Sequence, residues 1–294
     1  MKPIDIQRIF YPTDFSASSQ TAFAHALKLA VGAKSILTIY HTDPGSRSNS
    51  WESFPHVRQV LERWNLLPPH SPREAVVKLG LGVEKVAASH SDAVSSVLSF
   101  LHRHQHDLIV MTTHQPQGLD RYLKRSLAEP IARNSGECTL FLPANSAGFV
   151  SFGTGKVSLK NILIPVDQAR HSQRAAESAS TISQLVMADG VTHHLLHVGS
   201  PQTFPRIKRP ADDSATWKTM LREGEVVEQI LCAADDVRAD LIVMVTQGHE
   251  GLLDALRGSK AERVVRFAKC PVLTLPADQV LRSNPPEIIV FETD

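Results

Sequence analysis

The chain has 294 residues, a length that favours two domains at about 150 residues each. Its 31 Lys and Arg residues and 30 Asp and Glu residues leave a net charge of +1, which argues against a nucleic-acid partner, because phosphate contacts need a concentrated basic face. Apolar runs are too short for a membrane span or the core of a signal peptide, and three cysteines are too few for a disulfide framework, so we expect a cytoplasmic protein without a membrane partner.

The first half of the chain alternates short apolar runs with segments of helical spacing. Apolar residues three and four positions apart indicate a helix, and Ser16 or Ser18 is available to cap the first one. The predicted strands of this half are 9–11, 35–40, 108–111 and 139–142, and the predicted helices are 16–31, a segment around 94–101, and 121–134.

The second half shows the same alternation. Its predicted strands are 161–166, 193–198, 241–246 and 272–275, and its predicted helices are 172–187, 225–235 and 259–268. Strands that are apolar throughout and separated by helices indicate a parallel sheet covered on both faces. The expected fold class is therefore α/β, with doubly wound parallel sheets.

The two halves are copies of one another. Residues 107–144 and 240–277 align without gaps at an offset of 133 and match at 17 of 38 positions. The strands that begin near Ile9 and Ile162 are offset by 153, so the first copy carries about twenty more residues, which we place in the Pro- and Ser-rich segment 44–75. A polar, Gly-containing linker at 145–158 would join two tandem domains, 1–150 and 157–294.

Parallel α/β sheets bind ligands at the carboxyl ends of their strands, so the residues after each strand are the place to search for a site. In the second half, Asp167 follows the first strand, where it would accept hydrogen bonds from a ribose or hold a metal ion. Gly258 and Ser259 open the last helix, where free backbone N–H groups and the helix dipole would favour an anion. By spacing alone, a Gly-Ser pair before a helix also fits a simple turn and cap.

Three motifs together resemble the universal stress protein family. They are the run 10–16 (Phe-Tyr-Pro-Thr-Asp-Phe-Ser), the repeated Asp-Leu-Ile-Val-Met strand, and the Gly-Ser-x-Ala-Glu-Arg-Val run that begins at Gly258. The resemblance covers nearly the whole chain as two tandem copies. It implies Rossmann-like, adenine-nucleotide-hydrolase-like domains, in which many members bind ATP through Gly-x2-Gly-x9-Gly-(Ser/Thr) and an Asp after the first strand. Other members lack this motif and bind no nucleotide.

Carried over by position, the resemblance predicts a nucleotide site in the second half. Its residues would be Asp167, Val198, Met244, Val245, Gly248, Gly258, Ser259 and Lys260. The backbone of Val198 would meet the adenine. Val245 replaces the first glycine of the motif, so its bulk would weaken binding or favour a smaller nucleotide. Lys260 would compensate with a positive charge near the phosphates.

The first half keeps less of the motif. Its equivalent residues are Asp14, Thr42, Met111, Arg125 and Ser126, and the three glycine positions hold Thr112, Gln115 and Arg125. These side chains occupy the space that a phosphate chain would need. We therefore expect the first half not to bind ATP in the manner of the family.

The histidines and the absence of known catalytic motifs indicate no further site. His102, His104 and His106 alternate along the chain, which we interpret as exposed residues at a helix end rather than as a metal site. His41 and His197 follow the second strand of each copy and are expected to orient the neighbouring loop. No nucleophile elbow, P-loop or Cys-x-x-Cys pair is present, so we predict no catalytic or metal-binding residues and at most slow ATP hydrolysis.

The last strand of each copy would lie at an edge of its sheet. The resemblance implies that these two edges pair with each other, so that one tandem chain mimics a dimer of single copies. The apolar tail 287–291 would pack on its own domain, or add to an edge within the chain or across a homodimer.

The sequence leads to three functional hypotheses. We favour a non-catalytic stress-response protein that binds ATP or AMP, mainly in its second domain. The alternative is a nucleotide-free module that binds a partner or a small ligand. The least favoured is a slow ATP hydrolase.

Overall fold

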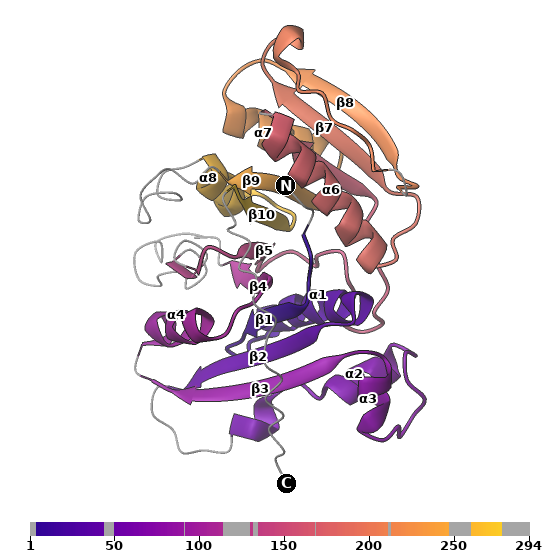
Figure 1. The fold of residues 1–294 in the computed structure, drawn as a ribbon, viewed down its shortest axis with the longest axis vertical. Helices are drawn as coiled ribbons and strands as arrows, with labels where there is room; N and C mark the ends of the chain where they lie inside the picture. Colours follow the sequence, from indigo (N-terminus) through magenta and orange to yellow (C-terminus); the bar gives the residue numbers. More distant parts are fainter. Residues whose placement is uncertain are drawn as a thin grey trace.

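A computed structural model describes residues 4–43, 50–90, 92–113, 130–131, 135–167, 169–210, 213–246 and 260–277. Within them, ten strands form one sheet in the order β3-β2-β1-β4-β5-β10-β9-β6-β7-β8 (Figure 1). All neighbouring strands are parallel except β5 and β10. Each half therefore repeats one five-stranded topology, and the predicted α/β class with two tandem Rossmann-like units is confirmed.

The strands of the first half are β1 (Arg8–Pro12), β2 (Ile36–Asp43), β3 (Gly82–Ser89), β4 (Leu108–Thr113) and β5 (Cys138–Pro143). Those of the second half are β6 (Asn161–Pro165), β7 (Thr192–Val198), β8 (Thr216–Arg222), β9 (Leu241–Thr246) and β10 (Val272–Pro276). Strand side chains alternate between the two faces, as Ile9 and Phe10 of β1 do, and both faces are buried.

Helices cover both faces of the sheet, as the doubly wound class requires. They are α1 (Ala17–Ala33), α2 (Val57–Arg63), α3 (Glu74–Lys78), α4 (Ala93–Arg103), α6 (Ala169–Leu185), α7 (Val226–Asp236) and α8 (Lys260–Phe267), with short 3-10 turns at η1 (Ser50–Ser53) and η3 (Pro201–Thr203). Helices α1 and α6 pack side by side on one face, whereas α4, α7 and α8 lie on the other (Figure 1). Most of the predicted helix 121–134 and all of 287–291 lie outside the described residues.

Two strands were not predicted, and they are the outermost ones. Strands β3 and β8 end the sheet, so each pairs on one side only. Most of their residues are partly or fully exposed, because no helix closes over the full length of an edge strand. The mixture of polar and apolar residues that results lacks the continuous apolar run by which the inner strands are recognised.

The two halves join through their last strands, as the resemblance implied. Strands β5 and β10 are antiparallel, and Leu140 pairs with Leu273 between them. These two positions differ by 133, the offset of the repeat, so the pseudo-twofold axis passes between them. Neither strand is a free edge, and the homodimer predicted through edge strands would have to use β3 or β8.

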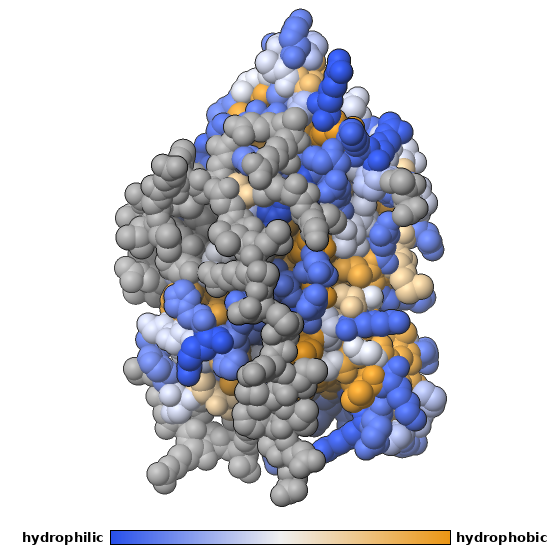
Figure 2. Space-filling model, viewed as in Figure 1, coloured by the Kyte–Doolittle hydropathy of each residue, from blue (hydrophilic) through white to orange (hydrophobic). Residues whose placement is uncertain are grey.

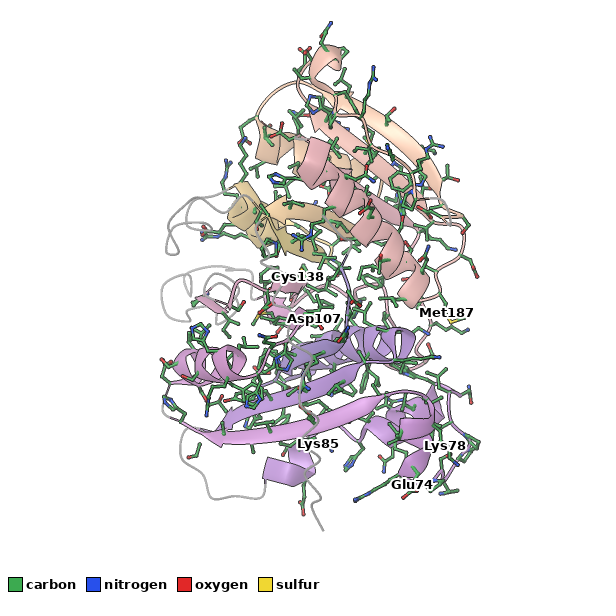
Figure 3. All side chains as sticks on the ribbon, viewed as in Figure 1. Glu74, Lys78, Lys85, Asp107, Cys138 and Met187 are labelled. Carbon is green, nitrogen blue, oxygen red and sulfur yellow. The ribbon has the colours of Figure 1, made fainter. Side chains whose placement is uncertain are left out.

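The aspartate that begins each Asp-Leu-Ile-Val-Met motif joins neighbouring strands. Asp107, labelled in Figure 3, accepts hydrogen bonds at 2.8 Å from the backbone N–H groups of Gln7 and Arg8 at the start of β1. Asp240 accepts the same pair of bonds from Lys160 and Asn161 at the start of β6. Each carboxylate thus satisfies backbone donors at a strand end, which explains the repetition of the residue by structure rather than by chemistry.

The additional segment of the first half packs against the linker. The indole N–H of Trp64, just after α2, donates to the Phe152 carbonyl at 2.9 Å. On the other side of the linker, Nε2 of the buried His25 accepts from the N–H groups of Phe149 and Val150 at 2.9 and 3.1 Å. Apolar surface gathers over α2 and α3, where Val77 is exposed (Figure 2).

Candidate functional site

The predicted site of the second half lies at the carboxyl edge of the sheet, where the strand order reverses. Strands β7 and β8 continue from β6 on one side, and β9 and β10 lie on the other. Asp167 follows β6, Val198 ends β7, and Met244 and Val245 are near the end of β9, so these residues share one edge. This is the switch point at which open α/β sheets bind ligands.

Part of each predicted site lies outside the described residues. These positions are Gly248, Gly258 and Ser259 in the second half, and Gln115, Arg125 and Ser126 in the first. Lys260 is described and is the exposed first residue of α8. In both halves the structure describes the strand ends and the first turns of α1 and α6, where the surroundings of Asp14 and Asp167 differ.

Asp167 presents an uncommitted carboxylate. Its backbone N–H donates to the Ser172 hydroxyl of α6 at 3.0 Å, which fixes the turn between β6 and the helix. The side chain is exposed and forms no hydrogen bond or ion pair with any other residue that the structure describes. The carboxylate is therefore free to accept hydrogen bonds from a ligand.

The equivalent Asp14 is committed within the protein. Its Oδ1 accepts from the N–H of Ser16 at 3.0 Å and from the hydroxyl of Ser19 at 2.5 Å, at the start of α1. Partial burial alone would raise the pKa of Asp14, but the hydrogen bonds from Ser16 and Ser19 outweigh it and hold the pKa below its ordinary value. The two aspartates therefore differ in availability although the sequence places them identically.

The position of the missing first glycine lies inside a strand. Val245 pairs with Leu275 of β10, and its side chain packs against the core on the α6 face. Its neighbour Met244 is buried on the opposite face, against α7 and α8. Much of the bulk of Val245 is therefore taken up by the core.

Two histidines fasten the loops that carry the aspartates. Nδ1 of His41 donates to the Thr13 carbonyl at 2.8 Å, and Nδ1 of His197 donates to the Val166 carbonyl at 3.0 Å. Because a carbonyl only accepts, the proton must lie on Nδ1 in both rings. The expected loop-orienting role is confirmed, although both histidines lie within β2 and β7 rather than after them.

The interpretation of His106 as an exposed helix-end residue is wrong. His102 and His104 are exposed, but His106 lies against the Phe10 ring, and its Nε2 is 3.2 Å from the Thr38 hydroxyl. Burial lowers the pKa of His106 to about 4. Among the described residues, no three His, Cys, Asp or Glu side chains come together in a group suited to a metal ion.

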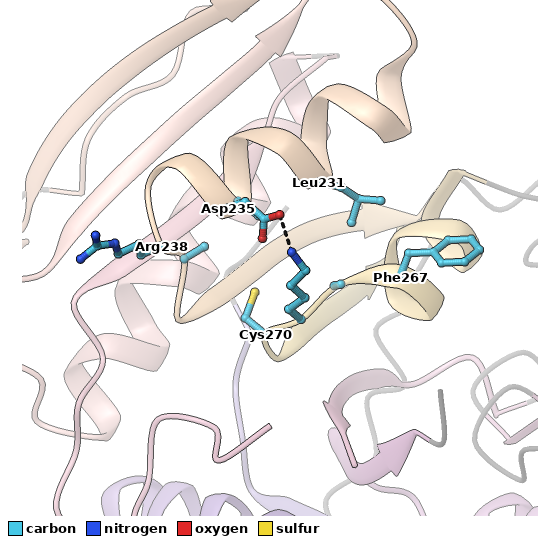
Figure 4. Close-up of a pocket in the computed structure, with 9 residues that line it drawn as sticks. Leu231, Asp235, Arg238, Phe267 and Cys270 are labelled. Carbon is cyan, nitrogen blue, oxygen red and sulfur yellow. Dashed lines mark hydrogen bonds and ion pairs between the residues drawn. The ribbon is translucent and has the colours of Figure 1, made fainter. Parts of the chain in front are cut away.

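A pocket lies at the opposite edge of the sheet. It has a volume of about 370 Å³ and opens between α7 and α8, beside the amino ends of β9 and β10 (Figure 4). Leu231 and Phe267 line it, and an ion pair of 2.7 Å joins Lys269 to Asp235 at its rim. It is separate from the carboxyl edge and shares no residue with the predicted site.

Every helix among the described residues is too short or too polar to span a bilayer.

Comparison with known proteins gives a consistent result. A model of the universal stress protein family matches residues 5–137 and 206–276. Universal stress protein Sll1654 of Synechocystis is 30% identical over 139 residues, which are 42% of this chain and 88% of that protein.

Solved structures match the whole two-unit arrangement. A universal stress protein from Archaeoglobus fulgidus covers 92% of this chain and 98% of its own, with a TM-score of 0.58 and 17% identity. Protein PA1789 of Pseudomonas aeruginosa, described as functionally unknown, covers 92% of both chains with a TM-score of 0.62 and 15% identity. At such identities the likeness concerns the fold.

Proposed function

Because the chain belongs to the universal stress protein family, we propose that it is a non-catalytic stress-response protein whose second half binds one adenine nucleotide, ATP or AMP. The first half would serve as a structural copy. Binding would take place at the carboxyl edge, between the ends of β7, β6 and β9. The chain would then carry one nucleotide rather than two.

The difference between Asp167 and Asp14 carries this proposal. A ribose presents two adjacent hydroxyl donors, and an exposed, ionised carboxylate is a strong acceptor for them. Within the described ranges no residue donates to the Asp167 carboxylate, whereas Asp14 already accepts from Ser16 and Ser19. A ligand at Asp14 Oδ1 would have to compete with these two hydrogen bonds, which hold the residues at the start of α1.

The phosphates would lie toward the start of α8. The N-terminus of a helix carries unpaired N–H groups and a partial positive charge, and Lys260 adds a full charge at the first residue. Hydrogen bonding and charge of this kind bind a nucleotide without activating a water molecule. We therefore expect no turnover, or hydrolysis too slow to be the function.

Nucleotide titration of three proteins tests the proposal. Isothermal titration of the wild type with ATP and AMP should give one site per chain. Asp167→Ala should weaken binding at least tenfold, about 1.4 kcal/mol, because the ribose loses its acceptor. The matched variant Asp14→Asn, which keeps an acceptor oxygen for the Ser16 N–H, should bind as the wild type does.

The other outcomes separate the alternatives. Absence of binding by the wild type at millimolar nucleotide would favour the nucleotide-free interaction module. Equal affinity in Asp167→Ala and the wild type would place the site elsewhere. A slow turnover that is lost in Ser259→Ala would support the ATP hydrolase.

A further inference from the structure

One connection of the second half runs beside the proposed nucleotide site. Residues 199–210 and 213–215, here called the strap, lead from the end of β7 to the start of β8. The strap begins directly after Val198 at the carboxyl edge and passes along α6, the helix that follows Asp167. Phe204 and Ile207 of the strap pack against the core on this face.

Two contacts fasten the beginning and middle of the strap. The Thr203 hydroxyl lies 2.7 Å from Nε2 of His197, the residue that also holds the loop before Asp167. The amide side chain of Gln173 forms two hydrogen bonds with the backbone of Lys208, at 2.8 and 2.9 Å. Gln173 adjoins Ser172, the partner of the Asp167 N–H, so the strap and Asp167 share the first turns of α6.

Asp213 anchors the far end of the strap. Its Oδ2 accepts from the Ser180 hydroxyl at 2.5 Å and from the Trp217 indole N–H at 3.0 Å. The same oxygen is 3.4 Å from Nδ1 of His193, a fully buried ring with no other partner for that nitrogen among the described residues. The Asp213 side chain is itself only 5% exposed. Its other oxygen, Oδ1, accepts from the Ala215 N–H at 2.9 Å. A buried carboxylate with four neighbours holds the strap firmly, because leaving it unpaired would be costly.

The first half supplies a natural comparison. The offset of 153 along the first helix, and the strand register of Ile9 with Leu37 and of Ile162 with His193, identify the equivalent positions. Ser180, Ser183 and His193 correspond to Leu27, Ala30 and Leu37. Apolar residues thus suffice to build this part of the fold. The buried polar group occurs in the half with the shorter connection and the exposed Asp167, whereas the first half joins the equivalent strands through the longer connection that carries α2 and α3.

The order Ser183, His193, Asp213 is that of a nucleophile, base and acid, but the geometry does not support catalysis. Ser183 Oγ is 3.3 Å from Nε2 of His193, yet its hydrogen bond of 2.7 Å goes to the Ala179 carbonyl one turn earlier in α6. In the interior of a helix, the nearby backbone N–H groups are already bonded and are unable to stabilise an oxyanion. The group is therefore better explained as an anchor.

We propose that Asp213, supported by His193, is a positioning residue that holds the strap as one wall of the nucleotide site, so that strap anchoring and nucleotide binding are coupled. This inference rests on the proposed function. Coupling of this kind is reciprocal: nucleotide should protect the strap, and loss of the anchor should weaken nucleotide binding.

Limited trypsin digestion measures the strap without any nucleotide. Arg206 and Lys208 are exposed on the strap and give two cleavage sites before Ile207 and Arg209. Asp213→Ala should be cut there at least ten times faster than the wild type. Asp213→Asn keeps one acceptor oxygen, for Ser180 and Trp217, but loses the acceptor for the Ala215 N–H, so it should restore part of the resistance. Asp189→Ala removes an exposed carboxylate near the strap and should behave as the wild type.

Nucleotide then tests the coupling. Saturating ATP should slow strap cleavage at least threefold in the wild type, and Asp213→Ala should bind ATP at least threefold more weakly, with partial rescue in Asp213→Asn. A general loss of stability would change both cleavage rates but would not remove the protection by ATP. If Asp213→Ala does not fold, His193→Leu, which introduces the residue of the first half, replaces it.

Three results would overturn the inference. Wild-type cleavage rates in Asp213→Ala would show that Asp213 is no anchor. Rapid cleavage together with unchanged ATP affinity would show an anchor without coupling. Absence of protection by saturating ATP in the wild type would also show that anchoring and binding are not coupled. If the wild type bound no nucleotide, the proposed function would fail on its own, while the digestion would still decide whether Asp213 holds the strap.

Discussion

Buried histidines are a distinctive feature at the scale of single residues, and His25, His106 and His193 are the three whose pKa values burial lowers most. His25 and His193 are fully buried and His106 nearly so, and each ring has a hydrogen-bond partner in the surrounding core. Desolvation lowers the pKa of each to about 4, although the Thr21 carbonyl and Asp213 act in the opposite direction on His25 and His193. These rings remain neutral in the folded protein at pH values where unfolded histidine is charged.

This difference predicts a protein that is destabilised by mild acid. Between pH 6.5 and 4 the unfolded chain binds protons that the folded chain refuses, so stability must fall as the pH falls. A shift from 6.5 to about 4 corresponds to on the order of 3 kcal/mol for each histidine. Below pH 4 these groups should cause no further loss.

Urea unfolding at pH 7, 6, 5 and 4 measures the effect. The free energy of unfolding should decrease steadily over this range in the wild type. His106→Gln removes one of the rings whose pKa burial lowers most and should make this decrease measurably smaller. Superimposable pH profiles of variant and wild type would contradict the assignment for His106.

Three residues, Asp14, Asp167 and His106, show which features the sequence pattern does not predict. Asp14 and Asp167 occupy the same motif position, and Ser19 and Ser172 are equivalent as well. In one copy the serine hydroxyl donates to the carboxylate, whereas in the other it accepts from the backbone N–H. Both arrangements suit the same pair of residue types, so the pattern predicted the site but not which aspartate is free. His106 was misread because spacing does not reveal the pocket formed by Phe10 and Thr38.

At the scale of elements, helices α1 and α6 meet at equivalent positions. A Cβ atom on Gly32 of α1 would lie 1.9 Å from the carbonyl oxygen of Leu185 in α6. The two residues differ by 153, the offset between the two helices, so they face each other across the pseudo-twofold axis. A tandem chain is able to place the smallest residue on one side and a large one on the other, which a symmetric dimer of identical copies is not.

Gly32→Ala should therefore destabilise the protein. Alanine favours a helix over glycine by about 1 kcal/mol, but a contact of 1.9 Å with a backbone atom forces the helices apart. Overpacking of this kind costs about 1–3 kcal/mol, so we expect a net loss of stability and a lower Tm. Calorimetry of Gly32→Ala beside Gly153→Ala, where the nearest atom is 3.9 Å away, checks this. A higher Tm in Gly32→Ala would show that the helices are not so close.

Elements were predictable in proportion to their burial. The inner strands and the helices that cover them carry continuous apolar runs or a clear helical period, and they were found. Strands β3 and β8 were not predicted, because an edge strand is buried by fewer neighbours and its sequence lacks a continuous apolar run. Helix α2 in the additional segment and helix α3 at its end are also short, and the packing of the segment against the linker depends on residues far apart in the chain, such as Trp64 and Phe152.

At the scale of the molecule, the two halves share one core. A single cluster of buried apolar residues contains Phe23 and Leu140 of the first half together with Ile162 and Leu273 of the second. The N-terminal arm also crosses between them, since the Ile4 N–H donates to the Ser178 hydroxyl of α6 at 3.3 Å. The predicted division at 1–150 and 157–294 remains a prediction from sequence, and this shared core argues that the halves depend on each other for stability.

Equilibrium unfolding should therefore be one cooperative transition. Three tryptophans divide between the halves, so one variant that keeps only Trp64 and another that keeps only Trp217 report each half separately. Urea curves followed by fluorescence should have the same midpoint in both variants, after correction for the stability of each measured by circular dichroism. Halves that unfold independently would give two midpoints, because each would lose its own core at its own denaturant concentration. Coincident curves would instead mean that unfolding one half exposes so much of the common core that the other is unable to persist alone.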